Sequence, residues 1–429
     1  MLDLLVIGAG LTGLTAAIYA AQAGRSVRVI TKGMSALHWA AGSIDLLGYL
    51  PDDTAIDAPL ASLAQLPAAH PLRHVETTVL RQTLSDLQAW LAAVGLPYTG
   101  DTGDTNLWLP SAVGARRPTF LAPLAQAAAR LDDDAPLLIV GFDRLRDFYP
   151  ALLADNLQRQ GHAARAHLLP LSLLTDRRDA NNVHLAEAFE DDTHIEAITH
   201  ALRPHIIAGE RIAFPAILGL ARHSEVIAKL ANALDAPIAE IPTLPPSVPG
   251  IRLHRALIST LEKHGGRVES NMEAVAFEAA DKSIQWVASA ASARPLRHRA
   301  RAYLLATGGI LGGGFNSDPS GRSWETVFDL PLTLPTDRGA WFRPEFLDTA
   351  GHPVFQGGVQ VNDDWQPVEV TGEVIYTNLW AAGNLIAHAD AIRTRSHEGL
   401  ALATGAAAAK MVVSSMQTDV IQPLDDNAD

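Results

Sequence analysis

Three glycines near the start of the chain are the first residues whose type and spacing indicate a chemistry. Gly8, Gly10 and Gly13 follow the apolar run 4–7 and open an Ala-rich stretch that is expected to be helical. In this context Gly8 permits a tight turn, Gly10 lets a phosphate approach the backbone, and Gly13 lets the helix pack closely on the strand. The N-terminus of the helix then offers free N–H groups to the phosphate. The pattern predicts a nucleotide site; the alternative is an ordinary glycine-rich turn.

The end of the second expected strand, residues 27–31, departs from the usual dinucleotide pattern. Thr31, Lys32 and Gly33 stand where a ribose-binding acid is common. The Thr31 hydroxyl can still bond a ribose hydroxyl, without the charge-assisted strength of a carboxylate. Some flavoproteins of the fumarate reductase and aspartate oxidase type similarly carry a hydroxyl residue followed by Lys-Gly. We therefore include Thr31 and Lys32 among the cofactor-binding candidates; a plain strand end is the alternative.

Two later motifs favour a flavin over a nicotinamide cofactor. The sequence Leu-Leu-Ala-Thr-Gly-Gly at 304–309 resembles the ATG strand of two-dinucleotide-binding flavoproteins, and Leu-Trp-Ala-Ala-Gly-Asn at 379–384 resembles their C-terminal flavin strand. This resemblance makes Thr307, Gly308, Gly383 and Asn384 cofactor-binding candidates. Asn384 stands where most members of that group carry Asp or Glu.

A segment of small and polar residues between the second strand and the first proline-rich stretch completes the flavin prediction. Residues 35–51 contain His38, Trp39 and Ser43, and backbone rich in small residues can lie along a flat isoalloxazine ring. Together with Pro-Thr-Leu-Pro-Pro-Ser-Val-Pro-Gly-Ile-Arg-Leu at 242–253, this segment resembles the corresponding parts of the B subunit of anaerobic glycerol-3-phosphate dehydrogenase. The resemblance covers nearly the whole chain and adds Ser43 to the cofactor-binding candidates.

The resemblance implies an activity and two partners. It implies a complex in which this flavoprotein joins a separate catalytic flavoprotein and a membrane-anchoring iron–sulfur protein. The complex would oxidise sn-glycerol 3-phosphate to dihydroxyacetone phosphate and pass the electrons to a quinone during anaerobic respiration. The family is described as carrying FMN in its B subunit, whereas the glycine fingerprint, which suits a pyrophosphate, predicts FAD.

Catalytic candidates follow the C-terminal flavin strand. Arg393, Arg395 and His397 precede a helix expected from Glu398 onward, so they could face the ring, take a hydroxyl proton or hold a phosphate. Arg252 and His254 follow the proline-rich motif and are a second such pair. A solvated surface charge or a structural hydrogen bond is the alternative for each of them.

The elements that must position these residues indicate an α/β protein with a Rossmann-like two-dinucleotide-binding flavoprotein fold and a smaller α/β insertion. Residues 4–7, 14–23 and 27–31 predict a strand, helix and strand. A helix is expected at 77–94, and a second strand and helix rhythm runs through 136–141, 145–160, 167–174, 212–218 and 224–234. We expect residues 1–60 and 240–429 to form the flavin domain and 61–239 to be inserted for substrate or partner binding.

Composition excludes several classes of protein. A formal charge of −14 over 429 residues argues against a nucleic-acid binder, which needs clustered Lys and Arg. With no cysteine, the chain cannot itself ligate an iron–sulfur cluster or use a thiol, and we expect no metal site. We expect no membrane span, because the apolar run 400–409 ends at Lys410. The start, from Met1 into residues 4–7 without a basic segment, predicts a cytoplasmic protein. The resemblance implies that this protein lies at the inner face of the cell membrane through its partners.

Two other functions stay open at this stage. The chain could be a scaffold that has lost its flavin and binds the catalytic and iron–sulfur partners, which the departures at Thr31 and Asn384 would suit. It could also be a free-standing flavin-dependent dehydrogenase of another small hydroxy or amino acid, against which the proline-rich motif speaks. Flavin content separates the first alternative from a redox protein, and turnover without partners would identify the second.

Overall fold

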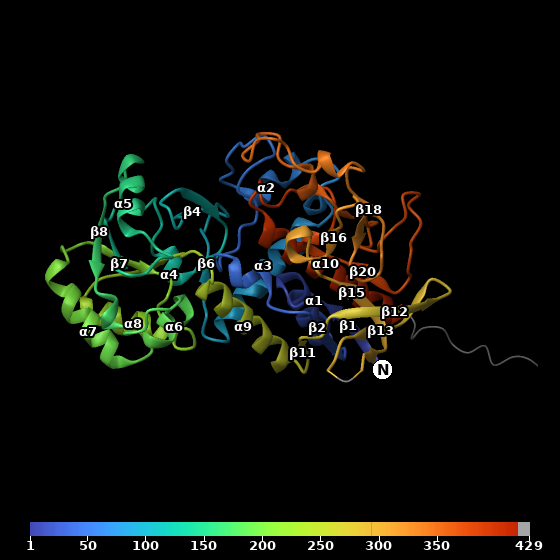
Figure 1. Cartoon of the computed structure of the whole chain (residues 1–429), viewed down its shortest axis with the longest axis horizontal. Helices are drawn as coiled ribbons and strands as arrows, with labels where there is room; N and C mark the ends of the chain where they lie inside the picture. Colours follow the sequence, from blue (N-terminus) through green and yellow to red (C-terminus); the bar gives the residue numbers. More distant parts are fainter. Residues whose placement is uncertain (293, 419–429) are drawn as a thin grey trace, which may run out of the picture.

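The computed structural model describes residues 1–292 and 294–418 and shows, within them, two lobes side by side (Figure 1). One lobe combines the N-terminal and C-terminal parts of the chain around a five-stranded sheet. The other, green in Figure 1, contains a four-stranded sheet from the middle of the sequence. Helix α9 (Val248–Lys263) joins them: Val248 and Ile251 pack in the core of the green lobe, whereas Leu257 and Leu261 pack in the core of the other.

The strands of the larger sheet are all parallel to their neighbours, in the order β11-β2-β1-β15-β20. They are β1 (Leu2–Ile7), β2 (Val27–Thr31), β11 (Arg267–Ser270), β15 (Ala300–Leu305) and β20 (Leu379–Ala381). A parallel sheet is covered on both faces, which explains the continuous apolar run in β1. The α/β, Rossmann-like fold class predicted from the sequence is confirmed.

Alternate residues of β1 supply the two cores of this lobe. Leu4 and Val6 face the core that contains α1 (Leu11–Gln22), α3 (Thr77–Ala92) and α10 (His397–Thr418). Leu5 and Ile7 face the opposite core, formed largely by residues 284–385. Because side chains on both faces are fully buried, the carboxyl end of β1, where the glycine fingerprint begins, is held rigidly.

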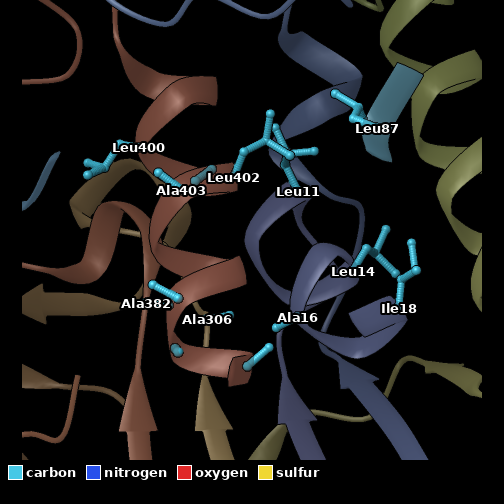
Figure 2. Packing of buried hydrophobic residues seen from close by; sticks show 14 of the residues in the cluster. Leu11, Leu14, Ala16, Ile18, Leu87, Ala306, Ala382, Leu400, Leu402 and Ala403 are labelled. Atoms are coloured by element: carbon cyan, nitrogen blue, oxygen red, sulfur yellow. The ribbon is translucent and has the colours of Figure 1, made fainter. Parts of the chain in front are cut away.

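Helices α1 and α10 pack closely beside each other, as Figure 2 shows with Leu11, Leu14 and Ala16 on one helix and Leu402 and Ala403 on the other. A Cβ added to Gly405 of α10 would lie 2.7 Å from the carbonyl oxygen of Thr12. This position therefore admits only glycine, and the small residues of α10 are explained by the close approach of the two helices.

Helix α10 is also the one helix among the described residues that is long and apolar enough to cross a membrane by length and composition. From the sequence we expected none, because the apolar run 400–409 ends at Lys410. However, 72% of the apolar window is buried inside the protein, as in a core helix. The apolar character of α10 is thus accounted for by its packing against α1 and the sheet.

The green lobe is an α/β unit, as expected, but its helices at 182–188 and 192–202 were not predicted, and the expected strand 167–174 ends at Leu169. Its parallel sheet has the order β10-β9-β7-β8. Its strands and helices are β7 (Leu137–Phe142), α5 (Pro150–Arg159), β8 (Ala164–Leu169), α6 (Asn182–Ala188), α7 (Asp192–Leu202), β9 (Arg211–Pro215), α8 (His223–Leu234) and β10 (Ile238–Ile241).

The stretch that precedes the green lobe packs with the larger lobe. Leu80, Leu84, Leu87 and Leu91 form one face of α3 at helical spacing and are buried in the core that contains α1. Residues 61–98, which we expected in the inserted domain, thus contribute to the larger lobe. The core of the green lobe begins near Ala129 and extends to Ile251.

The remaining α-helices and strands of the described residues belong to neither of the two parallel sheets. They are α2 (Pro59–Ser62), β3 (Tyr98–Thr99), β4 (Leu107–Pro110), β5 (Arg116–Thr119), β6 (Ala122–Pro123), α4 (Leu124–Ala127), β12 (Ala274–Ala280), β13 (Ser283–Ser289), β14 (Leu296–His298), β16 (Phe315–Ser317), β17 (Ser323–Glu325), β18 (Leu332–Thr333) and β19 (Gly358–Val359). Of these, β12, β13 and β14 form an antiparallel sheet of their own.

Candidate functional site

A cleft of about 850 Å³ opens at the carboxyl ends of β1, β2 and β15. This edge of a parallel sheet is where α/β proteins bind ligands. The cleft runs from the end of β2, at Thr31 and Lys32, past the fingerprint turn to the start of α10, at His397 and Glu398. It is large enough for an extended cofactor, since ligand sites commonly measure about 300–1,000 Å³.

The three fingerprint glycines have different surroundings. A Cβ on Gly8, whose φ is 114°, would lie 2.3 Å from the Ala306 carbonyl oxygen, and one on Gly13 would lie 1.9 Å from the Gly8 carbonyl oxygen. A Cβ on Gly10 would meet nothing closer than the Ser35 Oγ, at 3.9 Å. Gly8 and Gly13 are therefore needed for the fold itself, whereas Gly10 keeps part of the cleft free for a ligand.

Two helix N-termini reach the cleft. Gly10 is the N-cap of α1, so its N–H and those of the first turn have no partner within the helix. Helix α10 begins at His397, which also lines the cleft. Both ends carry partial positive charge, and the end of α1, at the fingerprint turn, favours an anionic group such as a diphosphate.

The end of β2 is held by local contacts. The Thr31 Oγ1 donates a hydrogen bond to the Gly33 carbonyl oxygen at 3.1 Å, and its lone pairs remain able to accept. Lys32 Nζ lies 2.6 Å from Oε1 of Glu273, which also lines the cleft. A carboxylate is thus present beside the expected ribose position, although it comes from a segment far away in the sequence.

The other flavin motifs also reach the cleft. Thr307, Gly308 and Asn384 line it, and Asn384 Nδ2 donates to the His397 carbonyl oxygen at 3.3 Å. The Thr307 Oγ1 is buried without a hydrogen-bond partner among the described residues. Gly383, with φ 81°, is not among the described residues that line the cleft, and its N–H donates to the Thr404 Oγ1 at 2.8 Å.

A glycine-rich loop that begins at the predicted residue Gly308 forms one wall of the cleft, and its other glycines were not predicted. Gly308, Gly309, Gly312 and Gly313 line the cleft, and the loop closes so tightly that a Cβ on Gly314 would lie 1.6 Å from the Gly308 carbonyl oxygen. Five glycines within residues 308–314 were the available signal. Backbone without side chains lets a flat or charged ligand approach closely.

Of the catalytic candidates, His397 lines the cleft, whereas Arg393 and Arg395 are not among the described residues that line it. Arg393 Nε pairs with Asp53 Oδ1 at 3.0 Å, and Arg395 Nη2 pairs with Asp45 Oδ2 at 2.6 Å. The turn before α10, in which Arg395 has φ 47°, directs both guanidinium groups toward the segment 45–53. The expectation that they face the ring is therefore corrected.

Ser43 also lies away from the cleft walls, in a buried polar network. It is 2% exposed, and its Oγ accepts a hydrogen bond from Arg117 Nη1 at 2.8 Å. The same guanidinium lies 3.6 Å from Asp45 Oδ1. This network joins the segment 43–45 to β5 and to Arg395, so the role of Ser43 in the structure is to support the segment behind the cleft.

The proton affinity of His397 reflects opposing effects. Burial disfavours its charged form, but the side chain of Glu398, with Nδ1 and Oε1 3.7 Å apart, and the charge of Asp45 outweigh burial and raise the pKa of the imidazole. His397 thus holds a proton more firmly than a free imidazole does. No group of three or more His, Asp or Glu side chains in the described ranges is arranged to hold a metal ion.

We predict that the free energy of unfolding decreases as pH falls from about 6.5 to about 4. Burial, followed by the neighbouring charges of His74 for His70 and of His38 and Arg255 for His254, lowers the pKa of each imidazole from 6.5 to about 4. The unfolded chain therefore binds protons that the folded chain does not, at a cost of up to about 3 kcal/mol per group.

Urea unfolding of the wild type and of His70→Asn between pH 7 and pH 4 measures this decrease. Asn can still accept the hydrogen bond that His70 Nδ1 accepts from the Leu72 N–H at 3.2 Å. The variant should lose less stability on acidification than the wild type. Equal slopes for the two proteins would exclude His70 as a source of the acid sensitivity.

Comparisons with known proteins identify the family. A family model described as an FAD binding domain matches residues 3–400. The probable B subunit of the anaerobic glycerol-3-phosphate dehydrogenase of Halobacterium salinarum is 32% identical over 418 residues, which cover 95% of this chain and 96% of that protein. The chain belongs to the family of anaerobic glycerol-3-phosphate dehydrogenase B subunits. The B subunit of the same dehydrogenase from Pectobacterium atrosepticum is 30% identical, and the match covers 96% of this chain and 98% of that protein.

The sequence left FMN and FAD open as cofactors. The matching family model is described by FAD, and none of these comparisons supports FMN. Among solved structures, the quinol fumarate reductase FrdA of E. coli covers 99% of this chain and 72% of its own, at 11% identity and a TM-score of 0.44. Mycobacterium smegmatis Sdh1 covers 97% and 69%, at 12% identity and a TM-score of 0.43. Because both scores lie below 0.5, the fold class rests on the strand order given above.

Proposed function

We propose that this chain is the FAD-carrying B subunit of an anaerobic glycerol-3-phosphate dehydrogenase. The observation that carries the proposal is the continuous cleft from the end of β2 to the start of α10, with Gly10 open to it at the N-terminus of α1. A mononucleotide would not need both ends of such a cleft. A dinucleotide, with adenosine near Thr31 and a flavin ring near Asn384 and His397, would use its full length.

The residues of the cleft fit this cofactor. The N–H groups of the first turn of α1 can bind the diphosphate, and the unpartnered Thr307 hydroxyl can bond a polar atom of the cofactor. The Thr31 hydroxyl and the Glu273 carboxylate are the groups near the expected ribose. Bound FAD would supply the ability to accept and pass on electron pairs.

Charge in the cleft favours an electron-transferring role over substrate oxidation in this chain. Among the described lining residues there is no arginine, and the one lysine, Lys32, is paired with Glu273 at the far end from His397. A phosphate dianion held beside a flavin ring would need a permanent cation there, and His397, which is close to the Glu398 carboxylate, is the only titratable cation among the described lining residues at that end. We therefore infer that sn-glycerol 3-phosphate is oxidised to dihydroxyacetone phosphate in the separate catalytic flavoprotein of the complex.

The partners follow from this role. Membership of the B-subunit family implies a complex of several chains, and we propose that electrons pass from this chain to a membrane-anchoring iron–sulfur protein and then to a quinone. The absence of cysteine supports a separate cluster protein. The complex would lie in the cytoplasm, at the inner face of the cell membrane, with this chain attached through its partners.

The absorbance spectrum of the purified chain, followed by chromatography of the released cofactor, tests the proposal. We expect yellow protein with equimolar FAD, and no reduction by sn-glycerol 3-phosphate without partners. Release of FMN would contradict the FAD assignment. A colourless, folded chain that cannot be reconstituted would favour a scaffold that has lost its flavin. Turnover by the isolated chain would place substrate oxidation here.

A further inference from the structure

A chain of two histidines leads to the backbone of the phosphate-binding turn. His254 Nε2 lies 3.0 Å from the carbonyl oxygen of Ala9, the residue between Gly8 and Gly10. His254 Nδ1 lies 3.0 Å from Nε2 of His38, and the two rings meet edge to face with centroids 5.0 Å apart. These residues come from the fingerprint turn, from the short helix η1 (Ala36–Trp39) and from α9.

The acceptor at the end of this chain determines the tautomers. A carbonyl oxygen only accepts, so His254 Nε2 must carry the proton that it donates to Ala9. Burial lowers the pKa of His254 to about 4 and lowers that of His38, so both rings are neutral near pH 7. His254 Nδ1 is then an acceptor, and the Nε2–H of His38 donates a hydrogen bond to it. The direction of both hydrogen bonds is thereby defined.

The hydrogen bond to Ala9 orients the next N–H group. The peptide between Ala9 and Gly10 is planar and trans, so its C=O and N–H point in opposite directions. His254 holds the C=O, and neither histidine is among the described residues that line the cleft. The Gly10 N–H must then point away from His254. Gly10 itself lines the cleft, where this N–H is one of the free donors of α1.

The two histidines are held by tight backbone packing rather than by their rings alone. The Ser247 N–H donates to the His38 carbonyl oxygen at 2.8 Å. A Cβ on Gly250 would lie 1.8 Å from the Leu37 carbonyl oxygen, so η1 approaches the first turn of α9 as closely as backbone can. His38 on η1 and His254 on α9 therefore keep a constant separation, which a positioning contact requires.

We propose that His254, oriented by His38, is a positioning residue for the diphosphate of the cofactor: it fixes the Ala9–Gly10 peptide so that the Gly10 N–H is aimed into the cleft. This inference rests on the proposed FAD site and adds to it a residue that does not touch the cofactor. A bound diphosphate gains from donors that need no reorientation, because preorganised groups lose less entropy on binding.

Titration of the apoprotein with FAD, followed by quenching of flavin fluorescence, tests the proposal in four variants. In His254→Leu the peptide loses its anchor, and we expect the dissociation constant for FAD to rise about five- to tenfold. His254→Gln keeps an N–H donor at the place of Nε2 and should restore the affinity to within about twofold of wild type. His38→Leu removes only the orienting partner and should give a smaller loss. His264→Leu, an exposed position at the other end of α9, is the matched control.

The outcomes distinguish failure of the proposed FAD-binding function from failure of the proposed positioning role of His254. If the wild-type apoprotein takes up no FAD, the proposed function fails. If the wild type binds FAD and His254→Leu binds it equally well, or His254→Gln is as weak as His254→Leu, the positioning role is overturned. Melting temperatures of the apoproteins show whether a variant is folded. Should His254→Leu not fold, His38→Leu decides, because wild-type affinity in that variant would overturn the role of the histidine chain.

Discussion

Replacing Gly10 by valine is expected to abolish FAD retention while the chain stays folded. Gly10 has φ −79° and ψ −176°, an extended conformation that valine adopts readily. Its Cβ would find free space, with the Ser35 Oγ 3.9 Å away, so the fold should accept the side chain. The added methyl groups would instead occupy the place where a diphosphate approaches the N-terminus of α1. The measurement is the FAD content per chain after purification and reconstitution.

Two other glycines provide controls for this experiment. Gly13→Ala should destabilise the whole lobe, because its Cβ would lie 1.9 Å from the Gly8 carbonyl oxygen. Gly24→Ala should keep FAD and lose only about 1 kcal/mol, since Gly24 has φ 74° but nothing within 4 Å of its Cβ. Equimolar FAD in Gly10→Val would show that no phosphate binds at this turn. A lower melting temperature for Gly10→Val than for Gly13→Ala would contradict the stated roles of the two glycines.

The elements of the fold were predictable because their signals are local. The strand, helix and strand around the fingerprint correspond to β1, α1 and β2, and the expected helix at 77–94 corresponds to α3. Each has an apolar period that a single segment displays by itself. The lobe in which α3 packs was not predictable in this way, because its leucine face would fit either core.

The site was predictable where a motif carries its own backbone geometry. Gly8, Gly10 and Thr307 lie at turns after parallel strands, and the sheet brings such turns together at one edge. Arg393 and Arg395 were misplaced because closeness in sequence to the flavin strand does not give a side-chain direction. Their direction depends on the turn before α10 and on Asp45 and Asp53, which lie more than 300 residues away.

The contacts between distant segments could not be predicted from the sequence. His38 and His254 are 216 positions apart, and each by itself is an ordinary partly buried histidine. Only the docking of η1 on the first turn of α9 brings the rings to hydrogen-bonding distance. The same holds for Glu273, whose carboxylate reaches the end of β2 because β11 pairs with that strand.

Replacing Asp45 by asparagine is expected to be the most destabilising single charge change behind the cleft. Asp45 is 8% exposed and is the shared partner of Arg117, which is 4% exposed, and of Arg395. Thr119 Oγ1 also donates to Asp45 Oδ1 at 2.7 Å. Asparagine keeps the shape but removes the charge, so the buried Arg117 and the partly buried Arg395 lose their nearest carboxylate. Breaking a buried ion pair costs about 3–5 kcal/mol.

Asp53→Asn is the matched control, because Asp53 pairs with Arg393 at the surface, where the loss should stay below about 1 kcal/mol. Urea unfolding of the apoproteins, followed by tryptophan fluorescence, compares the midpoints of both variants with that of the wild type. Equal midpoints for Asp45→Asn and Asp53→Asn would show that the buried network does not stabilise the lobe. A second change separates charge from shape. Adding Arg395→Met to Asp45→Asn removes one unpaired cation, and because an apolar side chain tolerates burial, this double variant should recover part of the lost stability.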